Sequence, residues 1–291
     1  MHRYSQFEDR DISAVIQCIA ELDERKKLLD LQRDAQIKEL VLSLSHREKD
    51  PEKLLSVISR IKPDMSCPFE NVQERIFACR QILNFFPSLS SHKADFVQHA
   101  PQGEDAIGIL DNNYIKAVFD ELSVKRAFSP ICFSSFDEIC ENISSGNCAY
   151  GILPIESSEN GKLLRFYNLI DRHDLKINAV CDISYSDDSA TTRYALVSKS
   201  IMFPKSCLGD PDYFEFAVNL ESPQSLNEIL CAASFCSMEL HRIDSVPIAY
   251  KEKEFSFCPV FKIEKSDIGT FLLYMYLDFP QYTPIGIYPK L

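Results

Sequence analysis

The sequence lacks long apolar runs, clusters of basic residues and histidine pairs at a metal-binding spacing. None of its uncharged apolar stretches approaches the roughly 20 residues that cross a bilayer, and its amino terminus has no apolar signal segment. The formal net charge of −12, with no local group of Lys and Arg to offset it, repels nucleic-acid phosphates. These absences predict a soluble cytoplasmic protein that has no membrane or nucleic-acid partner, no metal and no cofactor.

The cysteines do not form the pattern of a disulfide framework. There are 11 of them among 291 residues, an odd number, and none forms a C-x-x-C pair. They are scattered from Cys18 to Cys258. We therefore expect reduced and mostly buried thiols.

Glycine is absent before Gly103 and proline before Pro51, which favours helix in the first part of the chain. Apolar residues there recur at helical spacing. Pro51 follows Asp50 as a first helical residue follows its N-cap. Three helices are predicted, at residues 8–45, 51–61 and 68–86. They form a helical domain over residues 1–92.

After Gly103 the pattern changes to alternating short strands and helices, which predicts an α/β domain over residues 103–206. Ser135 is expected to cap a helix that ends at Gly146. Tyr150 to Leu153 read as a buried strand that Pro154 ends, at the edge where α/β sheets bind ligands. Residues 211–291 follow the order strand, helix, strand, strand, helix, strand.

Two short runs in the α/β segment resemble the signatures of prephenate dehydratase. GILPIESSENG, Gly151 to Gly161, is similar to its G-x-x-P-x-E-N-S-x-x-G turn, with Ser157 in place of Asn. TTRY, at residues 191–194, is similar to its T-R-F run, with Tyr194 in place of Phe. Members of this family remove carbon dioxide and hydroxide from prephenate to give phenylpyruvate.

The resemblance implies four catalytic candidates, Glu156, Ser157, Thr192 and Arg193. Arg193 would pair with a substrate carboxylate, and Thr192 would hydrogen-bond or protonate the leaving hydroxyl. Two alternatives remain open at this point. Thr192 and Arg193 can be ordinary turn and strand residues, and Glu156 can cap the next helix.

The spacing between the two signatures departs from the family. Thr192 follows Gly161 by 31 positions, room for little more than one βαβ unit. The family's fold has two lobes, and it builds most of the second lobe between these signatures. The sequence therefore predicts a truncated, periplasmic-binding-protein-like lobe whose motif residues are open to water.

The helical segment resembles the chorismate mutase domain that often precedes prephenate dehydratase. That mutase holds a dianion between arginines and a lysine in a bundle of two intertwined chains. Arg25 matches one such arginine by its L-x-x-R setting, while the expected lysine falls at Gln36. The alternative is a solvated charged helix face. Intertwining would make the protein a homodimer or a larger homo-oligomer.

Residues 211–291 resemble the ACT domain, a ferredoxin-like regulatory module that follows the catalytic domain in this family. The ending IGIYP, at residues 285–289, is similar to the family's L-G-S-Y-P. The resemblance places ligand-binding residues in two segments: Ser222, Pro223, Gln224, Ser225 and Leu226, and then Asp244 and Ser245. An ACT-like dimerisation module without a ligand is the alternative.

Together these patterns predict a multidomain α plus α/β protein with the family's motifs in degenerate form. The first hypothesis is a catalytically impaired relative that binds an aromatic small molecule, prephenate or an amino acid, or a partner subunit. The second is an active dehydratase whose site a neighbouring chain completes. The third is a structural dimer with no small-molecule site.

Overall fold

The computed structural model describes residues 9–47, 53, 68–87, 89, 96–97, 106–158, 161–184, 191–203, 208–219, 223–247 and 255–291. The helix predicted at residues 51–61 lies outside this part except for Lys53. The helices are α1 (Asp9–Arg47), α3 (Pro68–Phe85), α4 (Asn113–Lys125), α5 (Phe136–Ser144), α6 (Leu164–His173), α7 (Pro223–Phe235) and α8 (Ile268–Asp278).

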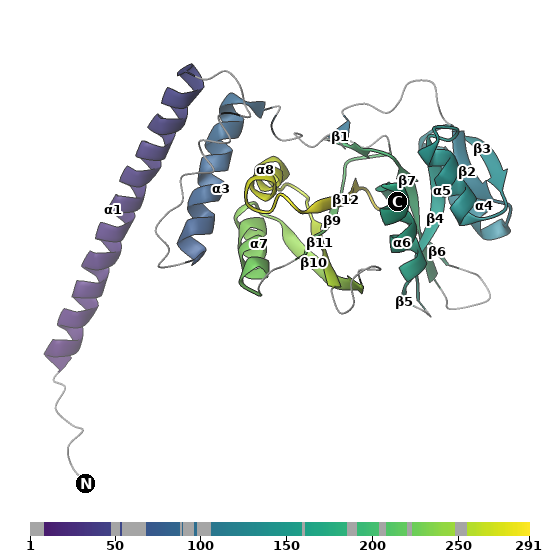
Figure 1. Cartoon of the computed structure of the whole chain (residues 1–291). Helices are drawn as coiled ribbons and strands as arrows, with labels where there is room; N and C mark the ends of the chain where they lie inside the picture. The colour runs from purple at the N-terminus through teal and green to yellow at the C-terminus, as the bar shows by residue number, and fades with distance from the viewer. Residues whose placement is uncertain are drawn as a thin grey trace, which may run out of the picture.

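The first and third predicted helices are confirmed as α1 and α3. Figure 1 shows α1 at one end of the molecule and α3 between α1 and the pair α7 and α8. The buried side chains of α3 recur at helical spacing, for example Val72, Ile76 and Cys79, and belong to one core with residues of α7 and α8. Arg75 of α3 also pairs with Asp278 of α8 at 2.6 Å. Thus α3 packs on the C-terminal part of the chain, and α1 packs on α3.

The other elements form a ten-stranded sheet and a separate two-stranded one. The large sheet has the order β10-β11-β9-β12-β6-β7-β4-β2-β3, with β5 beside β4. Its strands are β2 (Ala106–Leu110), β3 (Ser129–Phe133), β4 (Tyr150–Ser157), β5 (Gly161–Lys162), β6 (Lys176–Ser184), β7 (Thr191–Ser198), β9 (Tyr213–Ala217), β10 (Glu239–Pro247), β11 (Phe255–Lys262) and β12 (Thr283–Tyr288). In the small sheet β1 (Phe96–Val97) pairs with β8 (Ile201–Met202).

The caps predicted around α5 are confirmed. Ser135 is its N-cap, with Oγ accepting a hydrogen bond from the Glu138 amide at 3.2 Å, and Gly146 follows the C-cap with φ +80°. The prediction that Pro154 ends a strand is wrong, because β4 continues to Ser157. The ladder to β7 shifts register after Pro154, and such an irregularity accommodates a residue without an N–H.

The short interval between the two signatures holds few elements. From Gly161 to Ser184 the described residues form β5, α6 and β6, and β6 then pairs antiparallel with β7. One helix between two strands agrees with the room for little more than one βαβ unit that the sequence predicts. No second lobe is built from the described residues of this interval.

The C-terminal part has the predicted order β9-α7-β10-β11-α8-β12, with neighbours β12-β9-β11-β10. It continues the sheet of the α/β part, because Gly286 of β12 pairs parallel with Ile177 of β6. A Cβ atom at Gly286 would lie 2.6 Å from the Ile177 carbonyl oxygen. Glycine is therefore required where the two halves of the sheet join.

The described cysteines are free thiols, and most of them are buried. Burial raises the pKa of Cys140, Cys181 and Cys236 to about 12. Cys67 and Cys207 lie outside the described residues. Among the described helices, none is both long and apolar enough to cross a membrane.

Candidate functional site

The four predicted catalytic residues divide between the two faces of the sheet. Glu156 lies opposite Arg193 on the neighbouring strands β4 and β7, and Ser157 lies opposite Thr192. Side chains alternate along a strand. Ala195 and Val197, on the face of Arg193, pack with residues of α5 and α6, whereas Tyr194 and Leu196, on the face of Thr192, pack with residues of α4. The structure thus does not bring the four side chains into one site.

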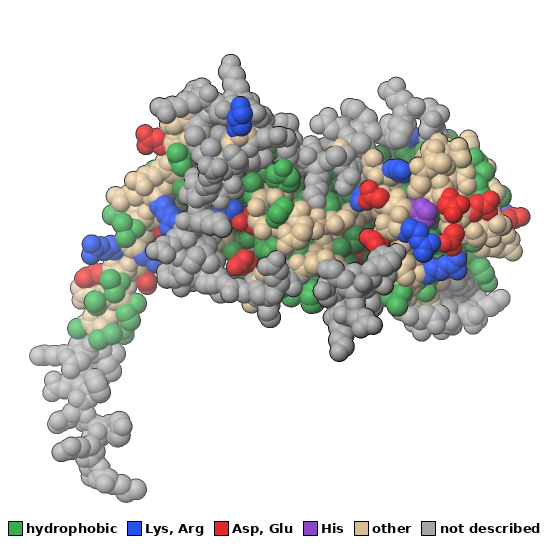
Figure 2. Space-filling model, viewed as in Figure 1, with side chains coloured by type: hydrophobic (Ala, Val, Ile, Leu, Met, Phe, Trp, Pro, Cys, Tyr) green, Lys and Arg blue, Asp and Glu red, His purple; other side chains and the backbone are tan. Residues whose placement is uncertain are grey.

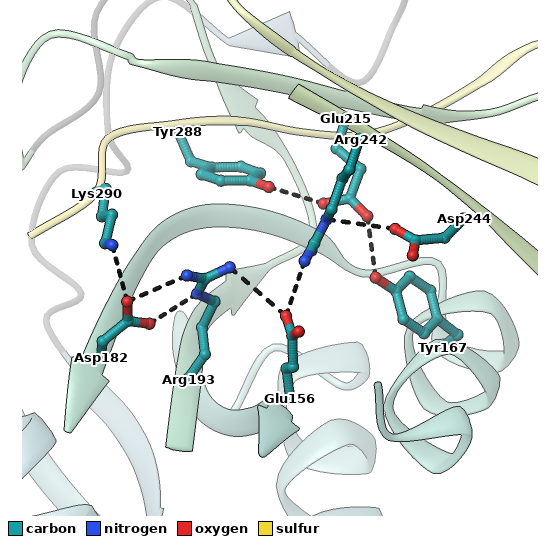
Figure 3. A network of polar contacts seen from close by, with 9 residues as sticks. All are labelled: Glu156, Tyr167, Asp182, Arg193, Glu215, Arg242, Asp244, Tyr288 and Lys290. Atoms are coloured by element: carbon teal, nitrogen blue, oxygen red, sulfur yellow. Dashed lines mark hydrogen bonds and ion pairs between the residues drawn. The ribbon is translucent and has the colours of Figure 1, made fainter. Parts of the chain in front are cut away.

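Arg193 is held by an internal carboxylate. Its Nε lies 2.7 Å from Asp182 Oδ1 and its Nη2 lies 3.1 Å from Asp182 Oδ2, while Lys290 Nζ lies 2.8 Å from Asp182 Oδ2 (Figure 3). The hydrogen bond from Arg193, together with Lys290, lowers the pKa of Asp182 to about 2. Asp182 therefore makes the bidentate contact with Arg193 that the family resemblance predicts for a substrate carboxylate.

Glu156 connects Arg193 to the C-terminal half of the sheet. Its Oε2 lies 3.5 Å from Arg193 Nη1 and accepts a 2.8 Å hydrogen bond from Arg242 Nη1. Arg242 is on β10, and β11, β9, β12, β6 and β7 lie between β10 and β4 in the sheet. Six strand spacings would separate β10 from β4 by about 29 Å in a flat sheet. The sheet therefore curls, and its concave side encloses this network.

A buried carboxylate lies beside these ion pairs. Glu215 of β9 is 1% exposed, and it accepts hydrogen bonds from Tyr288 at 2.7 Å and from Tyr167 of α6 at 3.0 Å (Figure 3). Burial, and then the charge of Glu215, raise the pKa of both tyrosines well above its usual value. Both hydroxyls therefore remain protonated donors.

The residues predicted to bind a ligand in the C-terminal part are dispersed. Ser222 lies outside the described residues, and Pro223 and Gln224 begin α7. Ser225 and Leu226 are half-buried in the first turn of α7. Asp244 belongs to the network, with Oδ2 3.3 Å from Arg242 Nε, and Ser245 beside it is exposed. Arg25 is exposed on α1.

A hollow of about 220 Å³ lies between α6 and the strands of the C-terminal part. Apolar side chains such as Ile170 and Ile285 line it together with polar groups, among them Asp171, Asn219 and the buried Lys176. Asn219 follows β9 and lies three positions before Ser222, where the first predicted ligand segment begins. Among the described residues, no three His, Cys, Asp or Glu side chains are grouped as a metal site requires.

Sequence reasoning missed most of the network: Tyr167, Asp182, Glu215, Arg242, Tyr288 and Lys290. The strand YFEFA contains Glu215 between Phe214 and Phe216, and its alternation indicates a solvent-facing carboxylate. Only the packing of the other half of the molecule on that face buries it. In the sequence, the charged residues within the strands could have indicated a polar network, but they do not show which residues pair with one another.

Comparison with known proteins identifies a family for part of the chain. Residues 113–186 match the family model described as Prephenate dehydratase. The match contains α4, β4 and β6, and it therefore contains Glu156 and Asp182. No match was found among curated proteins.

Two solved structures resemble the fold. Prephenate dehydratase from Streptococcus mutans has a TM-score of 0.52 and 18% identity, covering 64% of this chain and 98% of its own. Prephenate dehydratase from Arthrobacter aurescens in complex with L-Phe has a TM-score of 0.50 and 16% identity, covering 63% of this chain and 89% of its own. At these identities the likeness concerns the fold. The family model itself matches residues 113–186, a minority of the 291 residues.

Proposed function

We propose that this chain is a catalytically impaired relative of prephenate dehydratase that acts by binding a ligand. The observation that carries the proposal is the bidentate ion pair between Arg193 and Asp182. A substrate carboxylate that bound Arg193 in the same way would displace Asp182 and leave this carboxylate without its two hydrogen bonds from Arg193. In addition, Thr192 lies on the opposite face of the sheet from Arg193, so the two groups cannot act on one small substrate.

The ligand proposed is an aromatic small molecule, prephenate or an amino acid, and its proposed place is the hollow of about 220 Å³ beside α6. Lys176 Nζ lies 2.7 Å from Oδ1 of Asp174, an exposed side chain that can move aside for a ligand carboxylate, and Asp171 suits an amino group. Ile170 and Ile285 offer an apolar surface to a ring. The hollow adjoins the C-terminal part, whose assignment as an ACT-like domain belongs to this proposal.

The second candidate is an active dehydratase. Ser157 and Thr192 favour it, because they face one another on neighbouring strands and both are partly exposed. They would serve as donors to a leaving hydroxyl if a neighbouring chain covered this face.

The test is phenylpyruvate formation from prephenate by the purified protein at high concentration. We expect no turnover above the uncatalysed rate. Thr192→Val removes the proposed donor, and Thr191→Val, one position earlier on β7, is the matched control. Turnover that disappears in Thr192→Val and persists in Thr191→Val would establish the active dehydratase and overturn the proposal.

Ligand binding is tested separately by the unfolding temperature with L-phenylalanine or prephenate. A ligand present at 100 times its dissociation constant adds about 2.7 kcal/mol to the free energy of unfolding. Lys176→Met is expected to remove the shift. If neither compound changes the unfolding of the wild-type chain, a structural protein without a small-molecule site is the better description.

We also propose that the partner is a second copy of this chain, joined through α1. The residues Val15, Ile19, Leu22 and Leu29 lie along one face of α1 at helical spacing and are 53–59% exposed. Figure 2 shows apolar side chains gathered on the outer part of this helix. Such a stripe on a helix that extends from the body marks an interaction surface.

A further inference from the structure

We propose that the hollow beside α6 recognises a primary ammonium group on an apolar body and excludes compounds whose only charged group is a carboxylate. The inference rests on the ligand-binding function proposed above and names the chemical class of that ligand. Asp171, Asp174 and Lys176 are the charged side chains among the described residues that line the hollow. Two carboxylates thus accompany one ammonium, and the lining carries an excess of one negative charge.

The one cation of the hollow is already paired. Lys176 Nζ lies 2.7 Å from Asp174 Oδ1, and the lysine side chain is 3% exposed against 75% for the aspartate. A ligand carboxylate therefore reaches Lys176 only after Asp174 moves aside. Asp171, by contrast, is exposed and takes part in no ion pair within the described part of the chain. A ligand ammonium can bind Asp171 without breaking an existing contact.

The end of α6 adds to the negative potential. The hollow is lined by the second half of this helix, from Tyr167 to Asp171, and by the turn that follows it. The carboxyl-terminal end of a helix carries about half a negative charge. Arg172 and His173, the basic residues of the last turn, are not among the lining residues, and Arg172 Nη1 lies 3.5 Å from Asp137 Oδ1. The dipole of α6 therefore favours a cation in the hollow.

The uncharged groups of the hollow suit the rest of such a ligand. The side-chain oxygens of Asn219 and Gln281 are acceptors from the C-terminal part, and an ammonium has three donors to share between them and Asp171. Ile170 and Ile285 give an apolar surface for the body of the ligand. The volume of about 220 Å³ exceeds the roughly 150 Å³ that holds a benzene molecule, so there is room for a phenyl ring with a short amine chain.

The test compares two compounds that differ in their charged group. Phenethylamine and hydrocinnamate share a phenylethyl body, which carries an ammonium in the first and a carboxylate in the second. Thermal unfolding of the intact chain is followed near neutral pH during titration with each compound, at constant ionic strength maintained with sodium chloride. We expect a saturable rise in the unfolding temperature with phenethylamine and with L-phenylalanine, and no rise with hydrocinnamate or prephenate.

Single substitutions locate the ammonium in the hollow. Asp171→Asn should weaken phenethylamine binding about fivefold, the equivalent of about 1 kcal/mol for one ion pair. Asp120→Asn is the matched control and should leave binding unchanged, because Asp120 is also an exposed aspartate on a helix of the α/β part but does not line the hollow. Lys176→Met should remove the shift with L-phenylalanine, which has a carboxylate, and should not weaken the binding of phenethylamine.

The outcomes separate this inference from the function on which it rests. Hydrocinnamate binding as tightly as phenethylamine, or L-phenylalanine binding without phenethylamine, would overturn the ammonium as the recognised group and leave ligand binding in place. Equal weakening by Asp171→Asn and Asp120→Asn would show that the amine responds to overall charge and would overturn the inference in the same way. No rise with any of the four compounds would overturn both the inference and the proposed ligand site.

Discussion

Removing the hydroxyl of Tyr288 is expected to destabilise the protein by about 1.5–3 kcal/mol, the range for a hydrogen bond to a charged group. Tyr288 donates to Glu215 Oε2 at 2.7 Å inside the protein. In Tyr288→Phe, water cannot readily replace the donor, because Glu215 is 1% exposed. The cost therefore includes poorer solvation of a buried carboxylate.

Urea unfolding, followed by far-UV circular dichroism and by tyrosine fluorescence, measures this change. The chain has no tryptophan, so the fluorescence reports tyrosine directly. Tyr274→Phe is the matched control, because Tyr274 is equally buried but packs against Phe279, away from Glu215. Its change in the free energy of unfolding is expected to be smaller.

The double variant Tyr167→Phe/Tyr288→Phe tests the cause. Both hydroxyls bind the same carboxylate, Tyr167 through Oε1 and Tyr288 through Oε2. Their costs should therefore differ from additivity by at least about 0.5 kcal/mol. Equal costs for Tyr288→Phe and Tyr274→Phe, together with strict additivity, would refute the reasoning.

Three further predictions concern other parts of the chain. Arg193 lowers the pKa of Asp182 to about 2, so the ion pairs of Asp182 stabilise the fold fully above about pH 4 and are lost as the pH falls from about 4 to 2. In Asp182→Asn, the decrease in the free energy of unfolding over this pH range should be smaller by about 1 kcal/mol, after allowance for solvent screening. Gly286→Ala should lower the free energy of urea unfolding by more than the roughly 1–3 kcal/mol that an extra carbon usually costs in a packed core, because the new Cβ meets backbone atoms. Gly108→Ala should cost less, because the nearest atoms to a Cβ there belong to side chains. Leu22→Glu should convert a dimer into monomers in analytical ultracentrifugation, and an unchanged dimer would exclude α1 as the interface.

Much of the local structure could be predicted because its causes are local. Apolar spacing located α1 and α3, and the Ser135 cap with Gly146 bounded α5. The short distance from Gly161 to Thr192 correctly limited that interval to little more than one βαβ unit, formed by β5, α6 and β6. The prediction that Pro154 ends β4 was wrong, because the strand accommodates the proline through a register shift. That shift depends on pairing with β7, which the local sequence does not show.

The site could not be predicted in the same way. Alternation along a strand is visible in the sequence, and it already separates Thr192 from Arg193. The sequence does not show which helices cover each face of the sheet, since that depends on contacts between distant segments. The partner of Glu156 is 86 positions away at Arg242, and the partner of Tyr288 is 73 positions away at Glu215.

The order of the described elements, the caps of α5 and the short interval before β7 depend on neighbours along the chain, and they could therefore be derived from the sequence. The tertiary structure alone decided that the two halves share a sheet through Gly286 and that this sheet curls. It also decided that Arg193 binds Asp182. The physical reason is that a buried charge takes its partner from whatever group the packing places beside it.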